Sequence, residues 1–496
     1  MGCPDECVGG ESMTNDQKSL KSNVVYSAVL SVVNLIFPLI TFPYITRVLS
    51  PEGIGKINFA NSIISYFIMV VMLGIPSYGM REVARRSKDK KQLSVLVEEL
   101  LVINTILLVA CYAVYFTIVL FIPKFSQDKE LYFLFGVQIL FNVLGVEWFY
   151  RGMESFKYIT CRSIITKIIS FVLVFVCVKD ESDLFIYAVI TVVANVGAYL
   201  LNFCNLRKYH LEFVELSALN IKQHIAPLLI LFTTAIATNI STQVDTTMLG
   251  FIHGDEAVGY YSIAVKVKNI LVALTGAVST AVFPRLVAMS KNKKEYVSLA
   301  NEVYLYLMLL TVPAMVFFYE YAEEAVLILA GHEYLAAVQP MKIITITVFV
   351  VTFSCLFGGR ILVSLNRAEV QLHSVICGTV VNCLANLLLI PKLGVTGAAI
   401  ATVLSESTVL IYCVIAVPKE YKISFAPINT MKIFISSILA VFCAKTFVFP
   451  IGDNMLIQFA FDVIEFGVVY VIVLVILREK NIAKLVGIFF SKIKKK

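Results

Sequence analysis

Eight ionisable side chains lie deep inside long apolar stretches of this 496-residue chain. Ionisable groups inside such a stretch are energetically costly and usually face a partner or a water-filled cavity. Lysine binds phosphate oxygens as a point charge, and arginine adds a two-pronged fork of donors. The bases outnumber the acids before residue 370, so the set predicts a binding site for a phosphate-bearing ligand. The candidate substrate-binding residues are Lys167, Asp245, Lys266, Lys268 and Arg360.

Pairing with an acid is the alternative role for each base taken singly. Lys266 and Lys268 are two residues apart, which separates them by about 200° around a helix. We therefore expect that they do not both face one narrow cavity, and that at least one pairs with an acid such as Asp245. Four further charged residues lie nearer the ends of apolar stretches, where long side chains reach the interface with water. They are Arg47, Glu147, Arg162 and Lys445.

The composition is that of a membrane protein. Hydrophobic residues make up 59% of the chain and charged residues 15%, whereas soluble proteins carry about a quarter charged residues. Apolar runs of about twenty residues are long enough to cross a bilayer. We predict an all-α integral membrane protein with about fourteen transmembrane helices, at 24–49, 57–79, 94–122, 131–150, 158–178, 184–206, 225–250, 258–284, 299–319, 340–365, 370–391, 396–417, 430–447 and 454–477.

Lysine and arginine are concentrated in alternate loops. Cytoplasmic loops carry the excess of these residues in membrane proteins. Placing the N-terminus in the cytoplasm puts the basic clusters near Arg85, Arg207 and Lys293 on one side, together with the basic end of the chain. The loop from Tyr319 to Gln339, on the other side, is acidic. Both termini are therefore predicted to be cytoplasmic.

A short internal repeat organises the chain. Glu52–Ala60 aligns without gaps with Glu256–Ala264, and Gly394–Ala401 is a fainter third copy, each in a turn between two apolar segments. Repeats of this kind are typical of transporters built from two similar halves. An even number of spans in each half predicts a pseudo-two-fold axis along the membrane normal. The predicted divisions are 1–22, an N-terminal tail; 23–206 and 225–417, two six-helix bundles; 207–224, a linker; 418–477, two extra helices; and 478–496, a basic tail.

Several function classes are excluded or disfavoured by what the sequence lacks. It contains no GxxxxGK[ST] loop for ATP, no GxSxG motif and no His, Cys and Asp cluster with metal-ligand spacing, so we expect neither an enzyme nor a cofactor. A membrane enzyme would also be expected to carry a larger outer loop. Topology accounts for the basic loops, which argues against nucleic acid. The basic segment Asn481–Lys496 is expected to rest on anionic lipids or to act as a solvated tail.

Four motifs carry a resemblance to a known family. They are Arg47–Gly55, Glu147–Gly152, Thr246–Gly250 continued by Val258–Tyr261, and Leu389–Thr402. In these motifs the chain resembles the bacterial polysaccharide flippases. These are the O-antigen and capsule repeat-unit (Wzx-type) translocases of the multidrug/oligosaccharidyl-lipid/polysaccharide exporter superfamily. The similarity extends over roughly residues 20–480.

The resemblance implies two helix bundles in a V around a central cavity, working by alternating access. It implies an undecaprenyl-diphosphate-linked oligosaccharide as substrate, moved to the outer leaflet of the bacterial cytoplasmic membrane. A polysaccharide polymerase and chain-length proteins are the partners of such a pathway. Two alternatives of the same superfamily stay open. A lipid II flippase also has fourteen spans, whereas a drug/cation antiporter typically has twelve and an acidic cavity.

Overall fold

The structure is a computed structural model that describes residues 15–212, 219–421, 423–447 and 454–479. Within these ranges the chain forms helices and no strand. Thirteen of the described helices are long and apolar enough to cross a membrane. One of them, α15 (Ala368–Ala416), contains two of the predicted spans, so the prediction of about fourteen transmembrane helices is confirmed. The predicted lipid-binding segment Asn481–Lys496 and residues 1–14 lie outside the described ranges.

The amino-terminal lobe is built from nine helices, two of which are shorter than eight residues. Local chemistry sets the start of the second helix, α2 (Pro51–Met72). The Ser50 hydroxyl accepts a hydrogen bond from the Gly53 amide, and Pro51 occupies the first helical position. The helices are α1 (Asn15–Val48), α2 (Pro51–Met72), α3 (Ile75–Arg86), α4 (Lys90–Phe121), α5 (Pro123–Ser126), α6 (Lys129–Asn142), α7 (Glu147–Gly152), α8 (Phe156–Cys177) and α9 (Leu184–Asn205).

The second lobe repeats this plan. Its helices are α10 (Lys222–Ile252), α11 (Asp255–Met289), α12 (Lys293–Glu320), α13 (Ala322–Leu329), α14 (Val338–Ser354) and α15 (Ala368–Ala416), followed by α16 (Pro427–Thr446) and α17 (Met455–Ile476). Inside α15, Gly394 adopts φ 55° and ψ −128°, a backbone conformation that favours glycine. This break divides α15 into predicted spans 11 and 12, at the position of the third repeat copy.

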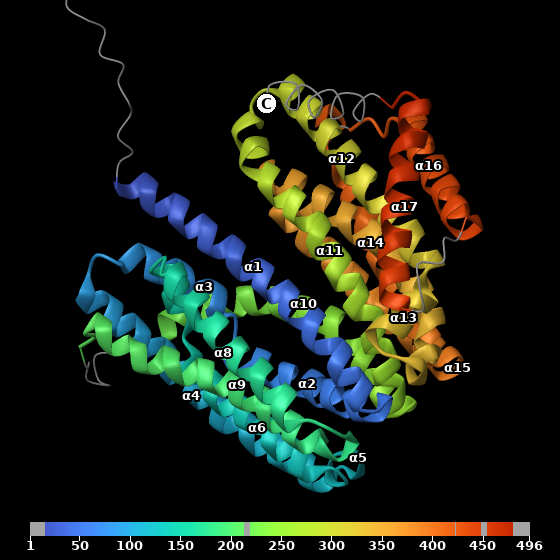
Figure 1. Ribbon diagram of the computed structural model, residues 1–496. Helices are drawn as coiled ribbons and strands as arrows, with labels where there is room; N and C mark the ends of the chain where they lie inside the picture. The colour runs from blue at the N-terminus through green and yellow to red at the C-terminus, as the bar shows by residue number, and fades with distance from the viewer. Residues whose placement is uncertain (1–14, 213–218, 422, 448–453, 480–496) are drawn as a thin grey trace, which may run out of the picture.

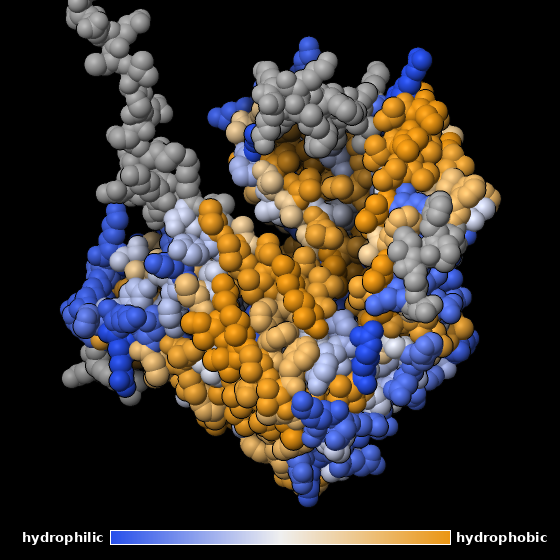
Figure 2. Space-filling view, in the orientation of Figure 1, coloured by the Kyte–Doolittle hydropathy of each residue, from blue (hydrophilic) through white to orange (hydrophobic). Residues whose placement is uncertain are grey.

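The two lobes form a V in which α1 and α10 lie between the other helices (Figure 1). The lobes meet where α2 packs on α11, and we call this the turn end because the turns after α1 and α10 lie there. They diverge toward the end where α1 begins and α17 ends, which we call the basic end. Figure 2 shows the surface hollowed between the lobes at the basic end.

The outer surfaces of the lobes are apolar, as a bilayer requires. Large side chains such as Phe121 and Ile415 are exposed, and Figure 2 shows apolar residues over much of the visible face, with hydrophilic residues gathered toward its two ends. In lipid such side chains are buried by acyl chains. The chain is therefore a multi-pass membrane protein. The predicted orientation and the residue boundaries of the repeats stay predictions.

Candidate functional site

A cavity of about 390 Å³ lies between the lobes, and it contains three of the five predicted site residues. Asp245 of α10 lines it together with Lys266 and Lys268 of α11, facing Asn58 of α2 and Glu406 of α15. The expectation that Lys266 and Lys268 do not share one cavity is wrong. Residues of α1, α2, α10 and α15 line the cavity together with those of α11, so it takes in lysines from well-separated positions around that helix.

A second cavity of about 470 Å³ lies in the amino-terminal lobe, between α1, α8 and α9. Lys167 lines this cavity, and so does Lys266, which reaches across from α11. Phe42 of α1 also belongs to both cavities. The two cavities therefore meet at Phe42 and Lys266, at the centre of the V.

Lys266 and Lys167 rest on aromatic rings of α1. The Lys266 Nζ atom lies 5.0 Å from the centre of the Phe42 ring, and the Lys167 Nζ atom lies 5.9 Å from that of Phe37. Cations are attracted to the faces of aromatic rings at these distances. No carboxylate of the described ranges lies within 4.0 Å of either lysine nitrogen, and the two lysines lie within electrostatic range of each other. Their charges are therefore available to an anion.

Asp245 has neutral partners. Its Oδ1 atom accepts hydrogen bonds from Asn382 and Asn386 of α15, at 3.0 and 2.5 Å. Its Oδ2 atom accepts from Tyr261 of α11 at 2.6 Å and from Thr402 of α15 at 2.8 Å. The expected pair between Asp245 and a lysine is not among the ion pairs of the described residues. The carboxylate instead ties three helices together at the wall of the cavity.

Glu406 lies within electrostatic range of Lys268. Both residues line the cavity between the lobes. Of the two neighbouring lysines, Lys268 is thus the one with an acidic neighbour. Lys266 is the one that faces both cavities.

Arg360 lies apart from the other predicted residues. It sits in a π-helical turn, Cys355–Leu362, where its Nη2 atom donates to the Thr280 hydroxyl at 2.9 Å. π-Helical turns are rare and often occur at functional sites. Thr280 is fourteen residues beyond Lys266 on α11, which places it about 21 Å closer to the basic end. Arg360 therefore belongs to the wall of the V, away from the two central cavities.

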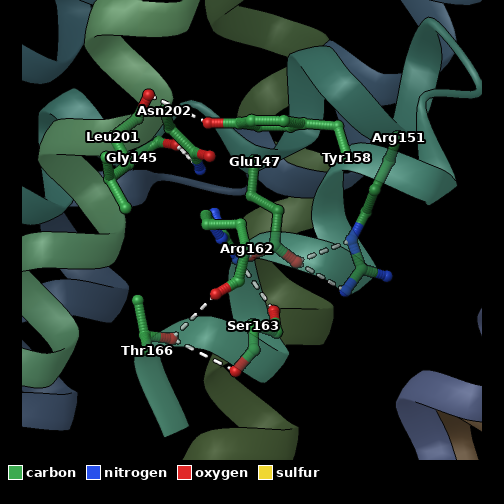
Figure 3. Close-up of polar contacts among 9 residues, drawn as sticks. All are labelled: Gly145, Glu147, Arg151, Tyr158, Arg162, Ser163, Thr166, Leu201 and Asn202. Atoms are coloured by element: carbon green, nitrogen blue, oxygen red, sulfur yellow. Dashed lines mark hydrogen bonds and ion pairs between the residues drawn. The ribbon is translucent and has the colours of Figure 1, made fainter. Parts of the chain in front are cut away.

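Arg162 of α8 is a cavity residue that the sequence reasoning missed. It was expected at the interface with water, but its side chain is only 7% exposed. It lines the cavity of the amino-terminal lobe, and its Nη2 atom lies 3.1 Å from the Glu147 carboxylate. Figure 3 shows Arg151 and Arg162 approaching this carboxylate from different sides. The signal in the sequence was an acid at the end of span 4 with two bases within fifteen residues.

A break in span 4 puts Glu147 in this position. A short 3₁₀ turn, Val143–Gly145, ends α6, and Val146 adopts φ 34° before α7 begins. The Gly145 carbonyl, freed by the break, accepts a hydrogen bond from the Asn202 side chain at 2.5 Å. The Tyr150 hydroxyl donates in turn to the Asn202 carbonyl. Because α9 supplies these partners, the break is held in place and Glu147 faces the cavity rather than lipid.

The arrangement is suited to holding an anion without covalent chemistry. Three bases, Arg162, Lys167 and Lys266, line the cavity of the amino-terminal lobe, where Glu147 is the one acid among the described lining residues. In the described ranges no group of three His, Cys, Asp or Glu side chains is placed to hold a metal ion.

Comparison with protein families identifies the chain along most of its length. The model of the polysaccharide biosynthesis protein family matches residues 20–290, and that of the lipid II flippase MurJ family matches residues 163–472. Among curated proteins, the chain is 26% identical over 275 residues to a protein of Escherichia coli strain K12 described as a candidate O-antigen transporter. The match covers 55% of this chain and 66% of that one. A similarly described protein of Shigella dysenteriae is 22% identical over 54% of this chain and 67% of its own length.

Solved structures show the same fold. The lipid II flippase MurJ in an inward closed conformation superposes with a TM-score of 0.72, covering 92% of this chain and 99% of that one at 16% identity. An inward-facing multidrug resistance transporter of the MATE family gives a TM-score of 0.55 at 15% identity, covering 78% of this chain and 96% of that one. The V of two bundles predicted from the resemblance is thereby confirmed. The chain belongs to the polysaccharide biosynthesis protein family, within the multidrug/oligosaccharidyl-lipid/polysaccharide exporter superfamily.

Proposed function

We propose that this protein moves undecaprenyl-diphosphate-linked oligosaccharide repeat units across the cytoplasmic membrane of a bacterium, for surface polysaccharide synthesis. The observation that carries the proposal is Lys266, a base at the meeting point of two polar cavities with no carboxylate of the described ranges beside it. A diphosphate would supply the negatively charged partner that Lys266 does not find among the described residues. The family and the relatives described as candidate O-antigen transporters support the same cargo.

The shape of the V supports transport by alternating access. The hollow opens at the basic end, and the lobes are in contact at the turn end (Figures 1 and 2). With the basic end in the cytoplasm, this state receives cargo from the inner leaflet. Release on the other side requires the lobes to part at the turn end and to meet at the basic end. A chain with this role works beside a polysaccharide polymerase and chain-length proteins.

Lys167 and Lys266 are the bases we assign to the cargo headgroup, with Lys268 near them and Arg360 nearer the entrance. Release demands moderate affinity, so charges in a water-filled hollow suit the task better than charges locked in ion pairs. Asp245 is assigned to the cavity wall. It positions α10, α11 and α15 rather than meeting the anionic headgroup, which it would repel.

Complementation tests the proposal. The gene is expressed in a bacterium that lacks its own repeat-unit flippase, and long-chain surface polysaccharide is measured. Restored polysaccharide supports the proposal. A strain depleted of its lipid II flippase is the parallel test, and rescue of that strain alone would instead assign the chain to peptidoglycan precursors. Rescue of neither strain by well-expressed protein would contradict the proposal.

A further inference from the structure

The Arg162 guanidinium is buried with only part of its hydrogen-bonding capacity used. Its Nη2 atom contacts the Glu147 carboxylate at 3.1 Å and the Ser163 hydroxyl at 3.4 Å. Its Nε and Nη1 atoms are buried and have no hydrogen-bond partner within the described ranges. A buried donor without a partner costs free energy. The guanidinium therefore keeps two donor atoms without a partner at the wall of the cavity that Arg162 lines, and a ligand reaches them when the side chain shifts.

Glu147 does not depend on Arg162. The Arg151 Nε and Nη2 atoms both donate to its Oε1 atom, at 3.0 and 2.7 Å (Figure 3). Both nitrogens of this charge-assisted contact share one carboxylate oxygen. Arg162 uses only the other oxygen, Oε2. The guanidinium of Arg162 is thus anchored by Glu147, while the carboxylate stays paired if a ligand draws Arg162 away.

The two arginines differ in their surroundings. Arg151 is half exposed and does not line the cavity, whereas Arg162 is 7% exposed and does. Arg162 should therefore interact more strongly with a ligand oxyanion than Arg151 would, because charge pairs are stronger where water is excluded. Arg151 is therefore a natural control for Arg162, because both contact the same carboxylate.

The rest of the cavity is equipped for a polar, ring-shaped ligand. Hydroxyls of Ser163, Thr166 and Thr191 line it, with the Asn195 amide and the aromatic rings of Phe37 and Tyr199. Placed polar groups among aromatic side chains fix the orientation of a small ligand. Lys167 adds a second positive charge within the same walls. A cavity that bound only a charged group would not need these hydroxyl, amide and aromatic side chains.

We propose that Arg162 is an oxyanion-binding residue of a separate subsite in the amino-terminal lobe, and that Glu147 positions its guanidinium. This inference rests on the proposed function. The oxyanion is a phosphate of the lipid carrier or a carboxylate of a sugar acid, bound by a donor nitrogen of Arg162 that has no partner within the described ranges. The aromatic and hydroxyl groups receive the adjoining sugar ring.

Isothermal titration of the purified full chain in detergent tests the subsite with two probes, undecaprenyl diphosphate and a free disaccharide containing a uronic acid. The variants are R162Q, R162K, E147Q and the control R151Q, each checked for an unchanged melting temperature. We expect R162Q to weaken binding of one probe by about tenfold to a hundredfold, the loss of charge-assisted hydrogen bonds. The probe affected identifies the source of the oxyanion.

The other variants separate binding from a structural role. R162K should restore part of the affinity, because the charge survives without the fork. R151Q should bind like the wild type. E147Q should weaken binding less than R162Q does, because the Arg162 guanidinium loses its anchor but keeps its charge. Wild-type affinity in R162Q for both probes would overturn the inference. So would equal losses in E147Q and R162Q together with lowered melting temperatures. A wild-type protein that binds neither probe would overturn the proposed function as well.

Discussion

Gly55 of α2 lies directly against the backbone carbonyl of Asp255, at the start of α11. A β-carbon placed on Gly55 would be 1.6 Å from that oxygen. Gly259 meets the Pro51 carbonyl in the same way, at 2.0 Å. The same shift of 204 residues relates Pro51 to Asp255 and Gly55 to Gly259. The two turns of the internal repeat thus form one self-complementary contact, as a two-fold axis requires, and this contact closes the V at the turn end.

Replacing Gly55 or Gly259 by alanine should open the turn end. The added methyl group cannot fit beside the opposite carbonyl, and such overpacking costs about 1–3 kcal/mol. The closed state should then be about five- to a hundredfold less populated relative to the state open at the turn end. The measurement is the reactivity of a cysteine at Asn58, in a chain without its natural cysteines, toward an impermeant maleimide added outside. Reactivity should rise and polysaccharide export should fall.

The matched control for the glycine contact at the turn end is Gly276→Ala. Gly276 lies on the same helix as Gly259, and a β-carbon there would meet nothing within 4 Å. It should leave both labelling and export unchanged. Equal maleimide labelling of the Gly259 and Gly276 variants would show that the glycine contact does not control access to the cavity.

Lys266→Ala should abolish export at normal protein abundance. The substitution removes the base at the meeting point of the two cavities without breaking an ion pair of the described residues. Lys266→Arg should retain part of the activity, because charge is kept while geometry changes. Lys294→Ala, at the exposed start of α12, is the control and should export normally. Normal export by Lys266→Ala would refute the role of the central base.

Asp245→Asn should lower stability rather than only transport. Four donors converge on the carboxylate from α11 and α15, and each bond to a charged group contributes about 1.5–3 kcal/mol. The asparagine amide turns one acceptor into a donor, which faces other donors. Thermal unfolding in detergent should show a clearly lower midpoint. Tyr261→Phe, which removes one of the four bonds, should show a smaller decrease. An Asp245→Asn protein that melts like the wild type would exclude this structural role.

Lys294 and Glu323 should lie on opposite sides of the membrane. Lys294 lies at the start of α12 and Glu323 just beyond its end, and the 28 residues of α12 span about 42 Å. Reporter fusions after Lys91 and Lys294 should indicate the cytoplasm, and a fusion at Glu323 the outside. Finding Lys91 and Glu323 on one side would refute the predicted orientation.

The repeat and the helix count were visible in the sequence because they depend on local pattern. Apolar length sets a span. The two repeat copies were expected in turns, but Gly53, Gly55 and Gly259 lie in the first turns of α2 and α11, so the repeat marks the starts of these helices. Even the break at Gly394, inside one long described helix, agrees with a predicted turn between spans. These features follow from the chain without knowledge of its packing.

The composition of the cavities did not follow from the sequence alone. Lys266 and Lys268 point in different directions around α11, but both line the cavity between the lobes, which has walls on several neighbouring helices. Position near a span end suggested an interfacial Arg162, but the break at Val146 turns Glu147 inward and the arginine follows its partner. Arg360 is separated from Lys266 by distance along α11, which periodicity does not reveal. Each case depends on tertiary packing.

Direct observation of lipid translocation tests the central claim. The purified protein is placed in vesicles that contain a fluorescent polyprenyl-diphosphate oligosaccharide, and a membrane-impermeant quencher reports the leaflet that holds the label. The wild type should equilibrate the label across the bilayer, while the Lys266→Ala protein, inserted to the same extent, should leave it in place. Translocation at equal rates by both proteins would contradict the account of the central base. No translocation by the wild type would contradict the proposed function itself.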